Sequence, residues 1–188
     1  MQDLIWVAVA LMLWLASVPS VPAADVRVTA RRDADAVLVE AQADLRADVQ
    51  VAWAVLTDYA RYAQFVPDLL SRRVLVREGN SVLIEQHGTA GFFLFRFPME
   101  VRLAVTEEPF ERVVSRLVSG NFKELDGVYE LTPTAQVVRF AYHGRLVPEF
   151  RLPPLIGLPA VRASVERQFG ALVREIERRS AGAEPAAR

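Results

Sequence analysis

Two histidines and a neighbouring glutamate are the residues of this chain whose types best suit acid–base chemistry. Glu85 and His87 are two residues apart, and Val82, Ile84 and Gln86 occupy the alternate positions of the same segment. Side chains two residues apart on a strand share a face, so this pair would lie opposite the apolar residues. A catalytic acid and base need to face a substrate pocket. The alternation therefore predicts that Glu85 and His87 are solvated and inert.

The rest of the sequence offers few other catalytic groups. His143 lies between Tyr142 and Gly144 and falls on the outer face by the same alternation. There is no Ser–His–Asp pattern, no phosphate-binding glycine loop and no close cluster of acids. The chain has no cysteine and two histidines, which excludes thiol catalysis and sulfur or histidine-rich metal sites. We predict no catalytic residue, no metal and no cofactor, and an enzyme is the second choice.

A long alternating segment offers a different chemistry, the binding of apolar molecules. From Phe93 to Val105 every second residue is apolar, whereas Arg96, Glu100 and Arg102 fall between them. One face of this strand is therefore apolar and the other is solvated. The apolar face needs a cover, which the amphipathic segment 160–179 provides as a helix. A cavity between a curved sheet and this helix is the predicted site.

The residues that would line this cavity follow from the same alternation. Phe140 and Tyr142 share the apolar face of the segment 136–147, and Tyr129 is a second polar group on that side. A buried tyrosine hydroxyl needs a partner, either a ligand oxygen or a backbone carbonyl. Burial of each large side chain also contributes about 1.5–3 kcal/mol to stability without any ligand, so a packed core stays open. The predicted ligand-binding residues are Phe95, Phe97, Met99, Tyr129, Phe140, Tyr142, Val165, Phe169 and Leu172.

The segment 148–159 differs from the rest of the chain. Four prolines and one glycine in twelve residues oppose regular structure, yet the segment is rich in large apolar residues. We predict that Leu155 and Ile156 form a portal or lid of the cavity and make transient contact with a membrane. The alternative is that they close the end of the sheet as core residues.

Shorter patterns give the order of the elements. Residues 37–45 alternate as a first strand, Asp48 is the predicted N-cap of a short helix, and a second short helix at 59–65 ends before Pro67. Six further strands joined by short turns are predicted at 72–77, 81–89, 92–107, 112–118, 122–131 and 136–147. The fold class is α+β, a curved antiparallel sheet of about seven strands with two short helices after strand 1 and one long C-terminal helix packed across it.

The N-terminal segment has the pattern of a signal peptide. Residues 4–16 are almost uninterruptedly apolar and fall short of the about 20 residues that span a bilayer. Val21 and Ala23 fit the small-residue rule for cleavage after Ala23, although Asp3 is the one charged side chain before the apolar run. We predict a signal peptide at 1–23, one domain at 25–179 and a flexible tail at 180–188. The protein would be periplasmic or secreted, or anchored to the inner membrane by an uncleaved segment.

The charge balance limits the partners. The chain has 22 Lys and Arg against 23 Asp and Glu, and Asp3 is the one charged side chain in the first 23 residues. The predicted domain is therefore close to neutral, which excludes nucleic acid as a partner. A hydrophobic small molecule is the expected partner, and the oligomeric state is left open.

The segment 51–67, VAWAVLTDYARYAQFVP, resembles the approach to the second helix in the START-like (SRPBCC, helix-grip) superfamily. Asp58, Tyr62, Phe65 and Pro67 stand at the polar, aromatic and proline positions of that motif. The resemblance is nearest to the polyketide cyclase/dehydrase and coenzyme Q-binding group and covers residues 35–179. It implies a helix-grip fold with a hydrophobic cavity, although carriers, cyclases and regulators share this scaffold.

Three functions fit these patterns. The first is an exported binding or carrier protein for a lipid, quinone or polyketide-like molecule held between the sheet and the C-terminal helix. The second is a polyketide cyclase or dehydratase that uses the same cavity, which an inward-facing His87 or His143 would favour. The third is an interaction module, because some relatives of the coenzyme Q-binding group are thought to act on ribosomes, from which export would separate this chain.

Overall fold

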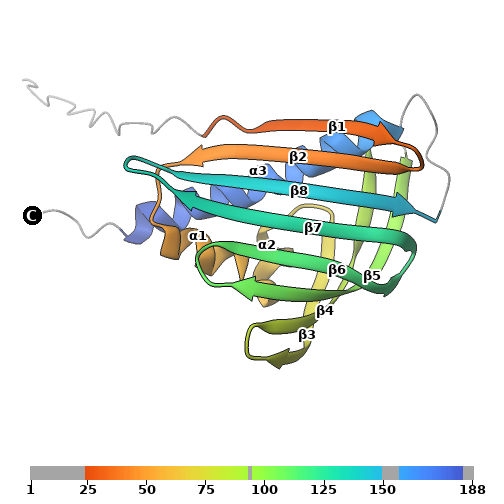
Figure 1. Cartoon of the computed structure of the whole chain (residues 1–188), viewed down its shortest axis with the longest axis horizontal. Helices are drawn as coiled ribbons and strands as arrows, with labels where there is room; N and C mark the ends of the chain where they lie inside the picture. Colours follow the sequence, from red (N-terminus) through yellow and green to blue (C-terminus); the bar gives the residue numbers. More distant parts are fainter. Residues whose placement is uncertain (1–23, 93–94, 150–156, 184–188) are drawn as a thin grey trace, which may run out of the picture.

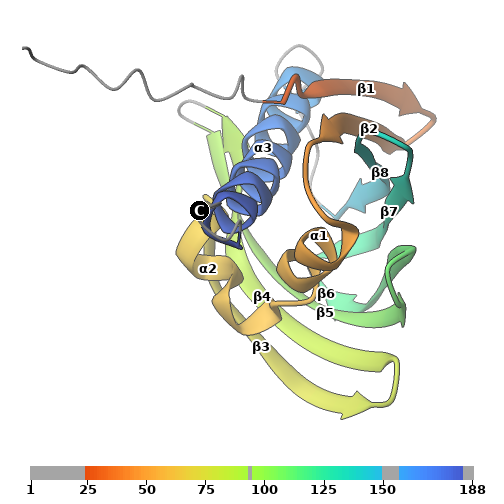
Figure 2. The ribbon, with the colours of Figure 1, turned by 90° about the vertical axis from the view of Figure 1, so that its left-hand side faces the viewer.

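The computed structural model describes residues 24–92, 95–149 and 157–183, and for residues 90–97 it describes no side chain. Eight antiparallel strands form one sheet in the order β1-β2-β8-β7-β6-β5-β4-β3. The sheet curves, and the C-terminal helix lies in its concave side (Figures 1 and 2). The predicted α+β helix-grip arrangement is confirmed, with eight strands in place of about seven.

The additional strand is β1 (Arg27–Asp33), which pairs with β2 (Ala36–Leu45) at one edge of the sheet. Its sequence is rich in charge, and Val28 is its one buried side chain. An edge strand pairs on one side only, so it needs little of the apolar alternation by which strands are recognised. The β1–β2 turn also lacks the usual glycine or asparagine, and Ala34 adopts the left-handed conformation with φ 54°.

The two short helices follow β2 as predicted. Helix α1 (Val49–Leu56) begins at Asp48, whose carboxylate accepts a hydrogen bond of 2.6 Å from the backbone N–H of Gln50. Such a side-chain acceptor satisfies a free N–H of the first helical turn. A 3₁₀ turn, η1 (Tyr59–Arg61), leads into the single-turn helix α2 (Tyr62–Phe65).

Strands β3 to β8 continue as a meander of consecutive hairpins. Gly79, with φ 55°, forms the predicted turn between the first two of them. The predicted strand 92–107 is divided differently, because Phe92 ends β4 and Phe95 begins β5. Alternation continues across this hairpin, so the sequence pattern could not mark its turn. The strands are β3 (Leu69–Glu78), β4 (Ser81–Phe92), β5 (Phe95–Glu108), β6 (Arg112–Gly120), β7 (Phe122–Pro133) and β8 (Val138–Pro148).

Helix α3 (Gly157–Ala183) is longer at both ends than the predicted 160–179. Its first turn includes Pro159, which a helix tolerates there because the missing N–H has no intrahelical partner. Part of the segment predicted as irregular is therefore helical, and the helix also takes in residues 180–183 of the predicted tail. No helix of the described residues is both long and apolar enough to span a membrane.

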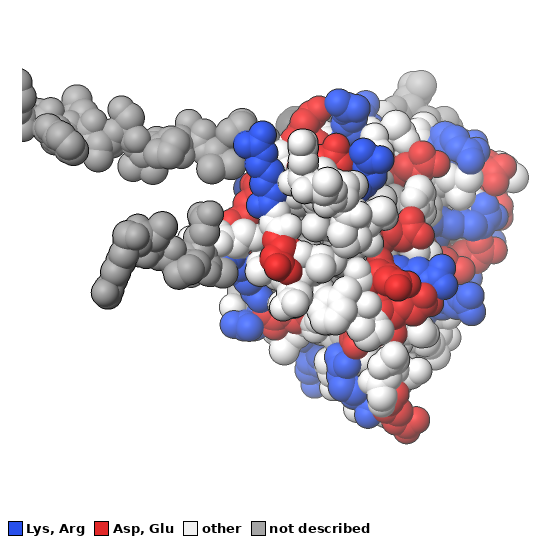
Figure 3. Space-filling view, turned by 60° about the vertical axis from the view of Figure 1, so that its left-hand side comes forward, with Lys and Arg blue, Asp and Glu red and all other residues white. Residues whose placement is uncertain are grey.

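The core lies between α3 and the concave face of the sheet. Met99, Val101, Leu103 and Val105 of β5 are buried, and the residues between them are exposed, as the alternation predicted. Phe169, Leu172, Val173 and Ile176 bury the apolar side of α3. On the face shown in Figure 3, acidic and basic residues are interspersed, without a large area of one sign.

Candidate functional site

An aromatic row crosses the interior beneath α3. The rings of Phe140 on β8 and Phe169 on α3 are stacked with centroids 4.5 Å apart, and Tyr129 on β7 continues the row 5.8 Å from Phe140. Tyr142 lies 4.6 Å from Tyr129. Phe140 and Phe169 are almost completely buried, so this row joins the sheet to the helix by close aromatic packing.

Tyr142 occupies a space that glycine provides. A Cβ at Gly144 would lie 2.5 Å from its hydroxyl oxygen, and a Cβ at Gly127 would lie 3.0 Å from its ring. The hydroxyl groups of Tyr129 and Tyr142 form no hydrogen bond with another described residue. Burial raises the pKa of both phenols above the usual value, so both remain O–H donors at neutral pH.

A small pocket opens beside this row, where α2, the start of β3, β4 and α3 meet. It has a free volume of about 20 Å³, enough for a single water molecule. Apolar and polar side chains share its wall, which is typical of a site that both holds and orients a ligand. Its lining residues are Tyr62, Val66, Asp68, Leu69, Arg72, Gln86, Met99, Tyr129, Gln168 and Leu172.

Arg72 provides the positive charge of this pocket. Its Nε and Nη2 both donate to the side-chain oxygen of Gln86, the residue opposite it on β4, with 2.9 Å from Nε. The guanidinium carbon lies 4.1 Å from the ring centroid of Tyr62 and 6.0 Å from that of Tyr59. These distances are those of cation–π contacts. The side chain is thus held by an amide and two aromatic faces.

Asp68, which lines the pocket, is held by contacts to the sheet and to α3. This residue has φ 65°, and its backbone oxygen accepts a hydrogen bond of 2.8 Å from the N–H of Thr89. A Cβ at Gly88 would lie 2.6 Å from the same oxygen, so glycine allows the turn before β3 to lie directly against β4. The Asp68 carboxylate is 2.7 Å from Nη2 of Arg167 on α3. The turn is therefore attached both to the sheet and to the helix.

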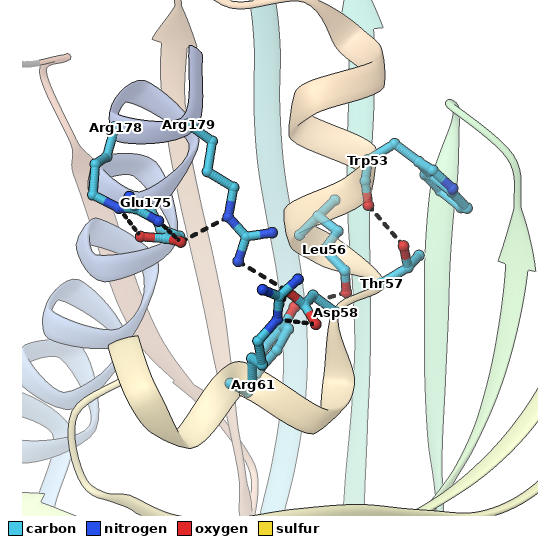
Figure 4. Close-up of polar contacts among 9 residues, drawn as sticks. Trp53, Leu56, Thr57, Asp58, Arg61, Glu175, Arg178 and Arg179 are labelled. Atoms are coloured by element: carbon cyan, nitrogen blue, oxygen red, sulfur yellow. Dashed lines mark hydrogen bonds and ion pairs between the residues drawn. The ribbon is translucent and has the colours of Figure 1, made fainter. Parts of the chain in front are cut away.

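Two further groups of polar contacts hold the short helices in place. Glu107 on β5 accepts both arms of the Arg77 guanidinium at 3.0 Å and the Tyr59 hydroxyl at 2.9 Å. On the other side, Arg179 of α3 bonds to Asp58 at 2.8 Å and to Glu175 at 2.7 Å (Figure 4). These contacts fix η1 between the sheet and α3.

Tyr62 is anchored through its hydroxyl as well as its ring. The hydroxyl donates a hydrogen bond of 2.9 Å to the backbone oxygen of Leu56, at the end of α1. Burial raises the pKa of Tyr62 above its usual value, and the charge of Arg72 partly opposes this effect. The phenol therefore stays neutral and orients the ring beneath Arg72.

The predicted site residues divide into four groups. Met99, Tyr129 and Leu172 line the pocket, whereas Phe140, Phe169 and Tyr142 belong to the aromatic row. Val165 is half-buried at the edge of the core. The side chains of Phe95 and Phe97, and both portal residues Leu155 and Ile156, lie outside the described residues.

The histidines lie on the outer face, where the alternation placed them. His87 is 3.6 Å from Glu85, which also binds Arg73 and Arg102. His143 is exposed beside Glu130. Within the described part of the chain, no group of three or more histidine, aspartate or glutamate side chains is placed to hold a metal ion.

The sequence reasoning missed Arg72, Gln86, Tyr62 and Asp68. A usable signal existed, because Gln86 shares a strand face with the apolar residues Val82 and Ile84. A polar residue on such a face indicates either a pocket or an internal partner. The glycine-containing turn at 78–80 then brings Arg72 opposite it, but this register could not be read from the pattern alone.

Comparison with known proteins agrees with this architecture. Residues 45–178 match the model of the family described as "Polyketide cyclase / dehydrase and lipid transport". The chain belongs to this family. A search of curated proteins finds no match to this chain.

Solved structures with the same fold include proteins of different functions. The STAR-related lipid transfer protein of Xanthomonas axonopodis has a TM-score of 0.64 and 14% identity over 80% of this chain and 93% of its own. The Zhui aromatase/cyclase of Streptomyces sp. R1128 has a TM-score of 0.63 and 15% identity over 86% and 98%. A START superfamily protein of Mycobacterium smegmatis has a TM-score of 0.60 and 14% identity over 77% and 97%. At these identities the similarity shows the START-like fold alone.

Proposed function

We propose that this family member binds a hydrophobic small molecule, such as a lipid, a quinone or a polyketide-like compound, between the sheet and α3. The pocket that joins Met99 and Leu172 to Arg72 and Gln86 is the observation that carries the proposal. It combines apolar walls with a few fixed polar groups, the composition of small-molecule sites in general. Entry of a ligand larger than one water requires side chains to move, and Met99 and Gln168 are unbranched and flexible.

Carrying the ligand unchanged fits the described pocket better than transforming it. The titratable groups in the pocket wall are Tyr62, Asp68, Arg72 and Tyr129. Asp68 is held by Arg167, and burial raises the pKa of both tyrosines. Neither tyrosine is therefore poised as a base at neutral pH. A cyclase or dehydratase remains the second candidate, supported by the fold shared with the Zhui aromatase/cyclase.

Native mass spectrometry of the protein isolated from its own cells, followed by organic extraction, tests the proposal. We expect a co-purifying apolar molecule at near-stoichiometric amount. Incubation of the purified protein with that molecule, followed by chromatography and mass spectrometry, separates the two candidates, because an enzyme changes the mass of the ligand and a carrier does not. A ligand-free protein that binds no added lipid or quinone would overturn the proposal in favour of an interaction module.

We further propose that the protein is exported and processed after Ala23. The backbone N–H of Ala24 donates a hydrogen bond of 2.9 Å to a side-chain oxygen of Glu177 on α3. Cleavage at this peptide bond would turn that N–H into a charged ammonium group beside a carboxylate, a stronger hydrogen bond than the neutral one. N-terminal sequencing of the protein from the periplasm should read Ala-Asp-Val. An intact N-terminus in the membrane fraction would instead indicate an uncleaved anchor.

A further inference from the structure

Among the described residues, Arg72 is a cation in the pocket without a carboxylate partner. Its contacts are with Gln86 and the rings of Tyr59 and Tyr62, and no ion pair of the described residues includes it. Asp68, the acid that lines the same pocket, is paired with Arg167, and Glu107, toward the other end of β3, is paired with Arg77. The positive charge of Arg72 is therefore not neutralised by an acid of the described residues.

The neighbouring arginine shows that the strand pair can supply a counter-charge. Arg73 lies opposite Glu85 in the β3–β4 register and forms an ion pair of 2.5 Å with it, on the outer face of the sheet. One residue away, Arg72 lies opposite Gln86, on the inner face. The amide of Gln86 orients the guanidinium but leaves its charge in place. A glutamate at this position would orient the guanidinium and also neutralise its charge.

The geometry leaves one side of the guanidinium available. An arginine side chain carries five N–H donors in one plane. The side-chain oxygen of Gln86 takes donors from Nε and Nη2, and Tyr62 covers a face of the plane. The hydrogen bonds that the guanidinium makes within the described residues come from Nε and Nη2, so Nη1 faces none of these acceptors at close range. A planar pair of such donors matches the two oxygens of a carboxylate.

We propose that Arg72 selects the ligand, and that this ligand is an apolar molecule carrying a carboxylate. The proposal deepens the proposed function and rests on it. The carboxylate would take the place of the single water that the pocket admits, and the apolar part would pass between Met99, Leu172 and the sheet. Tyr129, whose hydroxyl forms no hydrogen bond with another described residue, lines the same pocket and is placed to act as a second donor.

The physical basis of the selection is the cost of an uncompensated charge. Removing an ionised group from water is unfavourable unless an opposite charge or several hydrogen bonds replace the water. A ligand that covers Arg72 with an alcohol or a hydrocarbon removes water without replacing the charge. A carboxylate supplies both the charge and the acceptors. We therefore expect an acid to bind at least about tenfold more tightly than the alcohol of the same chain length, about 1.4 kcal/mol.

Competitive displacement of a fluorescent fatty acid tests this preference. The protein is loaded with 11-(dansylamino)undecanoic acid, which is then displaced by decanoate or by decan-1-ol at neutral pH. For the wild type we expect decanoate to displace the probe at a concentration at least about tenfold lower than decan-1-ol. In Arg72→Gln, decanoate and decan-1-ol should become equivalent. Arg73→Gln is the matched control, and it should retain the wild-type preference because it faces outward.

The outcomes separate this inference from the function on which it rests. Equal displacement by acid and alcohol in the wild type would overturn the carboxylate proposal but leave a hydrophobic binding site. A preference that survives Arg72→Gln would move the selecting group elsewhere. If neither the probe nor any competitor binds, the proposed function fails as well. The wild-type comparison needs no variant, so it holds even if Arg72→Gln does not fold.

Discussion

The aromatic row and the Arg72 pocket lie side by side in the interior of the protein. They differ in how completely the side chains in each are packed and paired. In the row, Phe140 and Phe169 stack at 4.5 Å and are almost completely buried. In the pocket, the described partners of Arg72 are an amide and two rings, with no carboxylate among them, and a free volume of about 20 Å³ adjoins it. Tyr129 belongs to both, since it continues the row and lines the pocket.

This difference distinguishes residues that stabilise the fold from residues that are available to a ligand. A side chain that fills its space and satisfies its polar atoms contributes to stability and has little left to offer another molecule. A group held in position with donors unused contributes less to stability and can bind. Substitutions in the two regions should therefore separate stability from binding.

The largest effect should come from the aromatic row. Phe169→Ala removes a buried ring from its stack with Phe140 and leaves a cavity, which should lower the free energy of unfolding by about 3–5 kcal/mol. Urea denaturation followed by circular dichroism measures it. The same substitution at the exposed Phe110, which contacts Trp53 at the surface, should cost less than about 1 kcal/mol. Similar losses at both positions would contradict the packed row.

Substitution of Glu107 should have the next largest effect on stability. Its carboxylate accepts hydrogen bonds from Arg77 and Tyr59 at the end of β3 remote from the pocket. Glu107→Gln removes the charge that accepts both arms of Arg77 and the Tyr59 hydroxyl, and should cost about 1–3 kcal/mol. The adjacent Glu108, in a half-exposed pair with Arg112, provides the control, and Glu108→Gln should change the unfolding curve little. Equal effects would mean that the buried carboxylate of Glu107 is no more important than a surface one.

Two tyrosines give a finer test of which hydroxyls are satisfied. Tyr62→Phe removes the hydrogen bond to the Leu56 carbonyl and should destabilise the protein by about 0.5–1.5 kcal/mol. Tyr142→Phe removes a hydroxyl that has no hydrogen bond with the described residues, so stability should stay within about 0.5 kcal/mol of wild type. If Tyr142→Phe also leaves ligand affinity unchanged, Tyr142 is removed from the predicted site.

The smallest effect concerns acid stability and the contacts that hold α3 over η1. The guanidinium groups of Arg178 and Arg179 lower the pKa of Glu175 from 4.5 to about 2. Because the folded-state pKa is the lower one, this carboxylate stabilises the protein above about pH 4.5, and the contribution is lost as pH falls toward 2.

Glu175→Gln should therefore flatten the fall of stability between about pH 4.5 and 2, measured by urea unfolding at several pH values. The control is Glu166→Gln, an exposed residue of the same helix with no ion pair among the described residues, which should leave the slope unchanged. An unchanged slope in both variants would show that the contacts of Glu175 with Arg178 and Arg179 (Figure 4) do not contribute to acid stability.

Local patterns determined much of this protein in advance. The alternation in β5 and β8 predicted which side chains turn inward, Asp48 predicted the start of α1, and the order of elements predicted the helix-grip fold. These features depend on near neighbours in the chain, because a strand has a period of two residues and a helix cap acts within one turn. The outward position of His87 and His143 followed from the same rule.

The tertiary structure decided where that interior is packed and where it is open. Packed core and pocket require the same alternation, so the sequence could not separate Phe140 from Met99. The position of Arg72 in the pocket depends on the β3–β4 register, which sets it opposite Gln86. It also depends on α2, which brings the ring of Tyr62 against the Arg72 guanidinium. Asp68 gained its partner Arg167 from 99 residues further along the chain. Such contacts join segments that are distant in sequence, and local periodicity carries no information about them.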